Sequence, residues 1–166
     1  MANESELLES LLIRTPLPGD LGFMAEMEQA PENRIFTLPG IPIPSHDDLQ
    51  NLIENPPTLI QNMQQRFICQ AREMPVGIVD LYDADFGMAT IWLGIIIAPH
   101  YRMQGLGAGC IRLVEAQAQK NRLTTAKALV HPLNLPAMSL FRACGYQPGE
   151  LIIGSQYRVL RKFLRG

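Results

Sequence analysis

The sequence of 166 residues contains little charge and little lysine. Charged residues make up 18% of the chain, the formal net charge is -2, and lysine occurs only at positions 120, 127 and 162. A chain without a broad basic face is not expected to bind nucleic acid. The C-terminal cluster of Arg158, Arg161, Lys162 and Arg165 is expected to be a solvated strand face rather than a binding patch.

The chain also has few cysteines and no long apolar run. Cys69, Cys110 and Cys144 lack the spacing of metal ligands, so no metal site is predicted. Cys69 and Cys110 lie in apolar contexts typical of reduced core residues. No run approaches the roughly 18 apolar residues of a membrane span, and residues 1–9 are acidic and polar, unlike a signal peptide. We therefore expect a cytoplasmic protein without a membrane partner.

Local patterns predict one α/β domain over residues 1–166. A helix is expected after Pro18 and ends at Pro31, a second follows an N-cap at Ser45, and the proline-rich segment 37–44 is expected to be a mobile loop over one edge. The expected strands are 11–15, 66–71, 76–82, 89–97, 125–130, 147–153 and 156–163. Further helices are expected at 59–63 (a turn or two), 106–121 and 135–144. Because 125–130 follows a helix that follows strand 89–97, it should return parallel beside that strand.

The stretch 95–115 joins a strand, a glycine-rich turn and a helix. Ile95, Ile96 and Ile97 are consecutive β-branched residues, as in a strand buried on both faces. Pro99 ends the strand, and from Leu106 the apolar residues recur at helical spacing. This stretch is therefore predicted to form a sharp strand-to-helix connection.

Two glycines lie in this connection, with an arginine before them. Glycine at positions 105 and 107 permits unusual dihedral angles and close approach of the backbone. The free N–H groups of a helix start, aligned with its dipole, form an anion site, and Arg102 adds a positive charge. The turn suits a pyrophosphate. Taken alone it could equally be an ordinary tight turn, and Arg102 an ordinary surface charge.

Two motifs together resemble the GNAT superfamily of N-acetyltransferases. Arg102–Gly107 matches that family's acetyl-CoA loop, which reads Arg or Gln, two residues, Gly, one residue, then Gly or Ala. Asn134–Ala137, then Leu140 with Phe141 and Gly145 with Tyr146, matches its second helix. The two motifs occur in the family's order and at its separation. Residues 76–83 and 94–97 are similar to the branch that contains ribosomal-protein and polyamine acetyltransferases.

The resemblance covers about residues 65–150 and implies a fold and a cofactor. The fold is a mixed, mostly antiparallel twisted sheet flanked by helices, with two central strands that splay apart. The pantetheine arm of acetyl-CoA would lie in that gap, against strand backbone at 95–97, with its pyrophosphate on the loop. Asn134 would bond the arm, although it could also be an N-cap. The cofactor residues so implied are Ile95, Ile96, Ile97, Arg102, Met103, Gln104, Gly105, Leu106, Gly107, Ala108, Asn134 and Phe141.

The chain departs from the family pattern at the position of the usual general acid. Many relatives have a Tyr seven residues after the Asn, where this chain has Phe141. A thiol with a pKa near 8.5 is a tolerable leaving group without that acid. Tyr146, Ser139, Cys144 or a water could substitute, although Tyr146 is expected to be a packed ring.

The usual general base is also absent, because strand 89–95 carries no carboxylate. Asp80 interrupts an apolar strand and is one candidate, whereas Asp83 and Asp85 are expected to be turn residues. His131, at the end of a predicted parallel strand, is the other candidate. No nucleophile–base pair is visible, which favours direct transfer over an acetyl-enzyme.

The sequence thus predicts an acetyl-CoA-dependent N-acetyltransferase acting on a primary amine. The acceptor could be a small amine, a polyamine or a protein amino group, and a homodimer is left open. The acids Glu26, Glu28, Glu32, Asp47 and Asp48 would suit a cationic acceptor, but are expected to be solvated helix faces. The alternative is an inactive acetyl-CoA-binding sensor, because both common acid and base positions are vacant.

Overall fold

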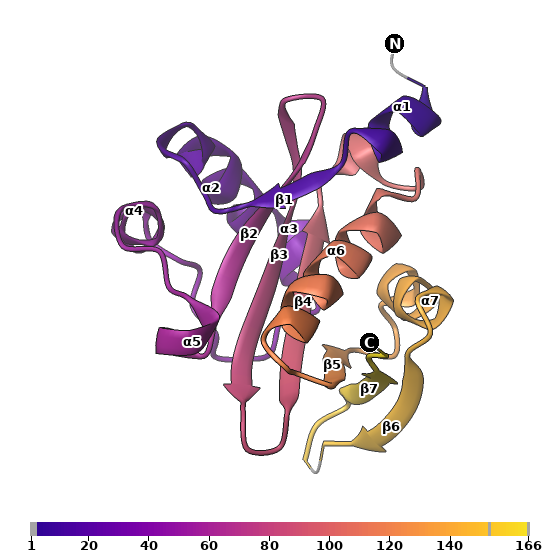
Figure 1. The fold of residues 1–166 in the computed structure, drawn as a ribbon. Coiled ribbons are helices and arrows are strands. Elements are labelled where there is room, and N and C mark those ends of the chain that lie inside the picture. Colours follow the sequence, from indigo (N-terminus) through magenta and orange to yellow (C-terminus); the bar gives the residue numbers. More distant parts are fainter. Residues whose placement is uncertain (1–2, 153, 166) are drawn as a thin grey trace.

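A seven-stranded sheet forms the centre of the computed structural model, which describes residues 3–152 and 154–165 (Figure 1). The strand order is β1-β2-β3-β4-β5-β7-β6, in which β4 and β5 run parallel and the other neighbouring pairs are antiparallel. The strands are β1 (Leu12–Arg14), β2 (Gln65–Ala71), β3 (Met74–Asp85), β4 (Thr90–Ile97), β5 (Thr125–Val130), β6 (Gln147–Leu151) and β7 (Arg158–Phe163). The α-helices are α1 (Glu4–Glu9), α2 (Leu21–Gln29), α3 (Pro31–Arg34), α4 (His46–Glu54), α5 (Leu59–Asn62), α6 (Leu106–Lys120) and α7 (Leu135–Ala143).

Helices cover both faces of the sheet and create two hydrophobic cores. Side chains alternate between the faces along each strand, so that Val79 packs with α6 and α7 while the adjacent Ile78 packs with α2 and α4. Figure 1 shows α6 and α7 on one side and α2 and α4 on the other. Cys69 and Cys110 are free and fully buried in the first core, as predicted. The larger core thus lies under α6, and the smaller one under α2 and α4.

Most expected elements are confirmed, including the parallel return of β5 beside β4. The expectation missed α1, whose start carries a reciprocal cap between Asn3 and Glu6. Pro31 follows the end of α2, as expected, but also begins α3, because proline is tolerated at the first helical position. The expected strand 147–153 ends at Leu151, and residue 153 lies outside the described residues. Within the described ranges, no helix is long and apolar enough to cross a membrane.

The proline-rich segment between α3 and α4 is a loop, as predicted, and is tied to its neighbours at two points. Arg34 donates a hydrogen bond to the carbonyl of Ile41 at 2.7 Å. The Tyr157 hydroxyl donates to the carbonyl of Phe36 at 3.0 Å. The loop is thereby held beside the C-terminal half of the sheet, and its mobility stays a prediction.

Three buried carboxylates are each paired with a cation. Asp20 pairs with Arg14 at 2.6 Å. Glu28 pairs with Arg66 at 2.6 Å, so the expectation that Glu28 lies on a solvated helix face is wrong. Glu115 pairs with Lys162 at 2.8 Å, and Lys162 therefore does not belong to a freely solvated basic cluster.

Replacing Asp20 with asparagine should destabilise the fold. Burial alone would raise the pKa of Asp20, but hydrogen bonds from Arg14 and from the Leu17 amide outweigh it and lower the pKa below its ordinary value. The carboxylate therefore stabilises the fold above its unfolded pKa, and that contribution is lost as pH falls through the lower folded value. At neutral pH the substitution should cost about 2 kcal/mol in urea unfolding, since Arg14 is partly solvated. The exposed Asp47→Asn should cost less than about 0.5 kcal/mol, and equal costs for the two variants would contradict the prediction.

Candidate active site

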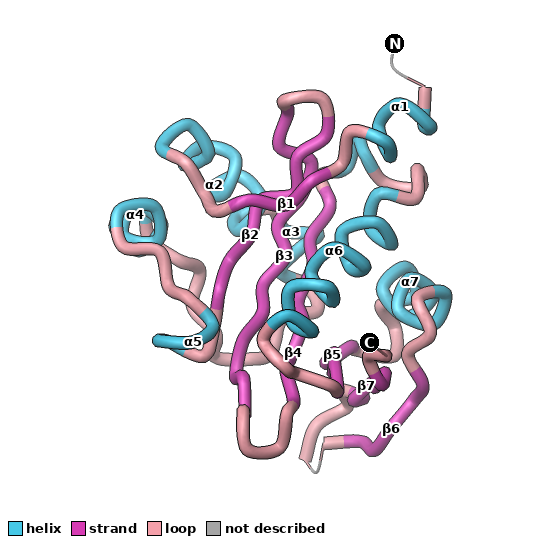
Figure 2. Tube along the Cα trace, in the orientation of Figure 1, coloured by secondary structure: helices cyan, strands magenta, loops and turns pink. Residues whose placement is uncertain are grey.

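The two central strands part from each other halfway along their length. Leu93 of β4 and Ala128 of β5 form the last pair of the parallel register. Beyond them, residues 94–97 remain paired with β3 and residues 129–130 remain paired with β7. In Figure 2, β4 lies with β1, β2 and β3 in one half of the sheet, and β5 lies with β6 and β7 in the other. The splayed central strands implied by the family resemblance are therefore present, and the inner edges of both strands keep backbone groups that no neighbouring strand occupies.

The N-terminus of α6 follows the end of β4. Gly105 is the N-cap residue with φ of +78°, and it offers no side-chain hydrogen bond to the first turn. The amides at the start of a helix have no partners within the helix, so they can donate to a ligand anion. A β-carbon on Gly107 would lie 3.1 Å from Leu140 of α7 and 3.7 Å from Ile97 of β4. The absence of a side chain at Gly107 therefore allows α6, α7 and β4 to meet closely at the gap.

Arg102 is held by the protein itself in the loop before α6. Its Nε donates to the Ile97 carbonyl at 2.9 Å, and its Nη2 donates to Asn33 Oδ1 at 3.0 Å. Gln104 donates to the carbonyl of His100 at 3.0 Å, while Met103 is almost fully exposed and has φ of +63°. Through Arg102, the loop before α6 is therefore attached to the end of β4 and to α3. A phosphate role for Arg102 stays a prediction.

Two residues of the second motif have structural partners. The Asn134 side chain accepts a hydrogen bond from the Ala137 amide at 3.4 Å, so it is the N-cap of α7. The Phe141 ring is 3% exposed and packs edge-on against Tyr146 with centroids 5.0 Å apart. Their predicted contacts with a cofactor remain predictions.

Tyr146 is a packed ring, as expected. It is 1% exposed, and its hydroxyl donates to Glu115 at 3.3 Å. Burial, followed by the charge of Glu115, raises the pKa of Tyr146 well above its ordinary value. The hydroxyl therefore stays protonated and engaged inside the core, where it cannot reach a ligand in the gap.

Tyr146→Phe should accordingly leave catalysis unchanged. Glu115 keeps its ion pair with Lys162 in this variant, so the loss of one hydrogen bond should cost about 1 kcal/mol in urea unfolding. Steady-state kinetics with saturating acetyl-CoA would measure the effect on kcat. A fall in kcat of about 100-fold, the size of a lost general acid, would contradict this placement.

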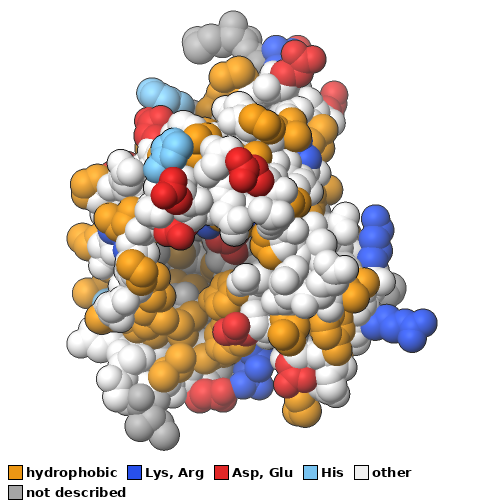
Figure 3. All heavy atoms as spheres, turned by 90° about the vertical axis from the view of Figure 1, so that its left-hand side faces the viewer, with side chains coloured by type: hydrophobic (Ala, Val, Ile, Leu, Met, Phe, Trp, Pro, Cys, Tyr) orange, Lys and Arg blue, Asp and Glu red, His pale blue; other side chains and the backbone are white. Residues whose placement is uncertain are grey.

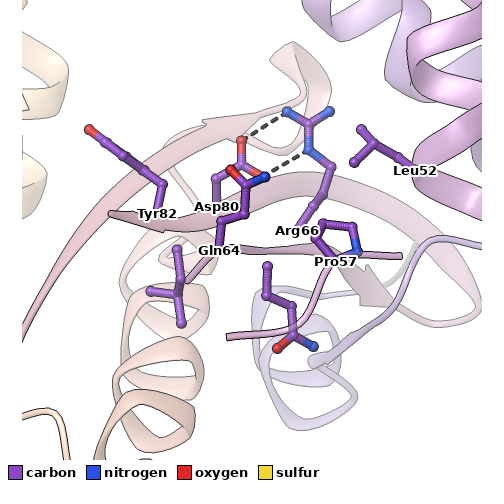
Figure 4. A pocket seen from close by; sticks show the side chains of 8 residues that line it. Leu52, Pro57, Gln64, Arg66, Asp80 and Tyr82 are labelled. Carbon is purple, nitrogen blue, oxygen red and sulfur yellow. Dashed lines mark hydrogen bonds and ion pairs between the residues drawn. The ribbon is translucent and has the colours of Figure 1, made fainter. Parts of the chain in front are cut away.

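Asp80 lies beside the point where β4 and β5 part. Its Cα pairs with that of Gly94, the first residue of β4 beyond the parallel register. Both carboxylate oxygens accept from Arg66 at 2.8 Å (Figure 4). Arg66 also donates to Glu28 at 2.6 Å. Burial would lower the pKa of the guanidinium, but Asp80 and then Glu28 raise it above its ordinary value. Asp80 therefore faces a permanent cation, with its side chain 34% exposed.

A cavity of about 260 Å³ opens in front of this ion pair. Its walls come from α4, the segment after it, β2 and β3 (Figure 4). Burial, followed by the charges of Asp83 and Asp80, raises the pKa of Tyr82 in this wall to about 12. Tyr82 also stacks on Trp92, which lies outside the cavity, and the Lys127 ammonium lies 5.3 Å from the centre of the Trp92 ring. The lining residues are Leu52, Pro57, Gln64, Gln65, Arg66, Asp80, Leu81 and Tyr82.

His131 occupies a separate aromatic cluster just after β5. Its ring centre lies 5.2 Å from those of Phe36 and Tyr157. Nδ1 accepts from the Leu133 amide at 3.1 Å, and Nε2 lies 3.1 Å from the side-chain oxygen of Gln156. The amide contact assigns the proton to Nε2 in the neutral ring. His131 and Asp80 share no hydrogen bond within the described part of the chain, so they do not form a dyad.

Glu28 and Arg66 were not predicted as site residues. A signal for Glu28 was present, because it lies four residues after Met24 and next to Met27, on the face that α2 buries. Arg66 had no comparable signal, since its neighbours Glu28 and Asp80 are 38 and 14 residues away in sequence. Asp80 was predicted, but its partner could only be found in the folded structure.

Comparisons with known proteins agree with this geometry. The sequence profile of the acetyltransferase (GNAT) family matches residues 32–146. Spermidine N-acetyltransferase from Vibrio cholerae, solved with CoA and spermine, has a similar structure with a TM-score of 0.76 and 20% identity, over 94% of this chain and 96% of that one.

Two further solved structures are similar at lower identity. The aminoglycoside acetyltransferase AAC(6')-Ib with coenzyme A has a TM-score of 0.75 and 16% identity, over 93% of this chain and 95% of that one. A domain from Methanocaldococcus jannaschii has a TM-score of 0.76 and 16% identity, over 93% and 98%. No curated protein sequence gave a significant match.

Proposed function

The chain belongs to the acetyltransferase (GNAT) family, and on that premise we propose that it transfers the acetyl group of acetyl-CoA directly to a primary amine. The observation that carries the proposal is the parting of β4 and β5 after Leu93 and Ala128, with the uncapped start of α6 at the open end of the gap. A strand edge can pair with the amide groups of a pantetheine arm, and a helix start can bind its pyrophosphate. One arrangement of backbone would thus serve both parts of one cofactor.

The direction of the cofactor follows from these two features. With the pyrophosphate at the first amides of α6, the arm would run along β4 from Ile97 towards Ile95. Its thioester would then lie near Gly94, where the strands separate and where Asp80 is paired. The solved relatives act on spermidine or aminoglycosides, which are amines, and an amine acceptor entering by the Asp80 cavity would meet the thioester there.

In the transfer step, the nitrogen of the neutral amine attacks the thioester carbonyl carbon. The carbon–sulfur bond breaks as the carbon–nitrogen bond completes, the amine proton passes to a base, and the CoA thiolate leaves. We assign Asp80, whose Cα pairs with that of Gly94, as the base or as the group that orients the ammonium. We place His131 second because both of its ring nitrogens are engaged. All three cysteines are buried, which supports direct transfer over an acetyl-cysteine intermediate.

The proposal is tested by mixing the protein with acetyl-CoA and a panel of primary amines and measuring thiol release. Turnover above hydrolysis with at least one amine is expected. A rise in melting temperature with acetyl-CoA but no turnover for any amine would instead favour an acetyl-CoA sensor. That alternative is motivated by Phe141, which has no hydroxyl, and by Tyr146, whose hydroxyl is enclosed in the core.

The assembly state is a separate question. One structure of the Vibrio cholerae spermidine N-acetyltransferase is dodecameric, whereas the sequence of this chain leaves a homodimer open. Light scattering on the purified protein measures the mass directly, and a particle larger than two chains would contradict the homodimer.

A further inference from the structure

The charges around the Asp80 cavity leave room for one ammonium group and not for several. The cavity wall contains one cation, Arg66, and one carboxylate, Asp80, with Glu28 behind Arg66. The negative charge of Asp83 contributes to the raised pKa of Tyr82, and Lys127 lies over Trp92 on the same sheet face. Three carboxylates against two cations leave a net charge of -1 around the cavity. One ammonium on the acceptor would neutralise this net charge, and a second would bring excess positive charge close to Arg66 or Lys127.

Arg66 has a buried donor without a partner in the described part of the chain. Its Nη1 is buried and has no hydrogen-bond partner among the described residues, while Nε and Nη2 bind Asp80 and Glu28. Figure 4 shows this nitrogen on the side of the guanidinium away from Asp80, next to Leu52, which lines the same cavity. An unpaired buried donor on a charged group is costly, so an acceptor oxygen arriving with a ligand would bind there favourably.

The remaining wall carries no charge and combines apolar and aromatic side chains with two glutamines, Gln64 and Gln65. Leu52, Pro57 and Tyr82 line the cavity, and the next ring is Trp92. Figure 3 shows hydrophobic side chains gathered around a hollow on the α2–α4 side of the molecule, with acidic and basic side chains at its rim. These surfaces fit an apolar body attached to the amine better than a second charged group.

Resting on the proposed function, we infer that the acceptor is a singly charged amine with a carbonyl oxygen beside it and an apolar body, the chemistry of a peptide α-amino terminus, and not a polyamine. The ammonium faces Asp80, the neighbouring carbonyl accepts from Arg66 Nη1 once the Leu52 side chain moves aside, and the apolar side chain lies against Tyr82. A polyamine offers Arg66 no acceptor and brings additional positive charge.

Two matched pairs of acceptors test this inference. Phenylalanine amide differs from 2-phenylethylamine only by its carboxamide, and 1,4-diaminobutane differs from butylamine only by its second amine. With rates expressed per unprotonated amine, kcat/KM should be on the order of 10- to 100-fold higher for phenylalanine amide than for 2-phenylethylamine. It should be about 10-fold lower for diaminobutane than for butylamine.

Variants connect each preference to its residue. Lys127→Glu should abolish the roughly 10-fold discrimination against diaminobutane. Lys120→Glu makes the same charge change at the exposed end of α6 and should leave the discrimination unchanged. Arg66→Lys keeps the charge but lacks Nη1, and should remove the preference for the carboxamide. Equal or faster acetylation of diaminobutane, or equal rates for the two phenyl amines, would overturn the inference while leaving the acetyltransferase proposal intact. No turnover with any of the amines would overturn both.

Discussion

Gly107→Leu should abolish the stabilisation that acetyl-CoA confers on the wild-type protein. A β-carbon at this position already lies 3.1 and 3.3 Å from the two methyl carbons of Leu140, and 3.7 Å from Ile97. A leucine side chain would therefore compete for the space between α7 and β4, beside the gap where we place the arm. At acetyl-CoA concentrations of about 100 times Kd, the wild type should gain ~2.7 kcal/mol. This corresponds to a rise of about 5–10 °C in melting temperature for a chain of this size.

Gly19→Leu is the matched control for this experiment. A β-carbon at Gly19 meets nothing within 4 Å, and this residue lies away from the gap in the turn before α2. Gly19→Leu should keep the full acetyl-CoA shift. A Gly107→Leu protein that folds and still shows the wild-type shift would show that the cofactor does not occupy the gap between β4 and β5.

Local patterns predicted the strand, turn and helix on which the proposed cofactor site is built. The strand 95–97, the turn at Gly105 and the helix from Leu106 are adjacent in sequence, so their physical signals are local: β-branched residues, glycine dihedral freedom and helical periodicity. The cap at Asn134 and the buried ring of Tyr146 follow in the same way. The parting of β4 from β5 was expected only from the family resemblance, because no spacing in either strand encodes where the pairing stops.

The acceptor side could not be predicted in the same way. Glu28, Arg66 and Asp80 come from α2, β2 and β3, and their pairing depends on how α2 lies on the sheet. An acidic residue on a helix is usually solvated, and that base rate was the reason Glu28 was misassigned. What makes Glu28 different is its position beside Met24 and Met27 on the buried face, together with a cation that only tertiary structure brings to it.

Asp80→Asn should lower kcat/KM for the amine by about 100-fold or more, the usual size of a general base contribution. Asparagine retains one oxygen for Arg66 but has no charge to accept a proton or to face an ammonium. The acetyl-CoA shift in melting temperature should be retained, because the cofactor loop lies at the other end of the gap. The loss in stability should be only about 1–2 kcal/mol, since Asp80 is 34% exposed and Arg66 keeps Glu28.

Asp85→Asn provides the control, because it makes the same chemical change on the same strand. The exposed Asp85 accepts a hydrogen bond from the Met88 amide in the turn after β3, and an asparagine oxygen can accept the same bond. Kinetics should therefore be unchanged in Asp85→Asn. If Asp80→Asn raises KM for the amine with kcat unchanged, Asp80 binds the ammonium and does not accept the proton. If kcat/KM stays within about two-fold of the wild-type value, Asp80 has no part in the reaction, and the acceptor must enter elsewhere along the gap.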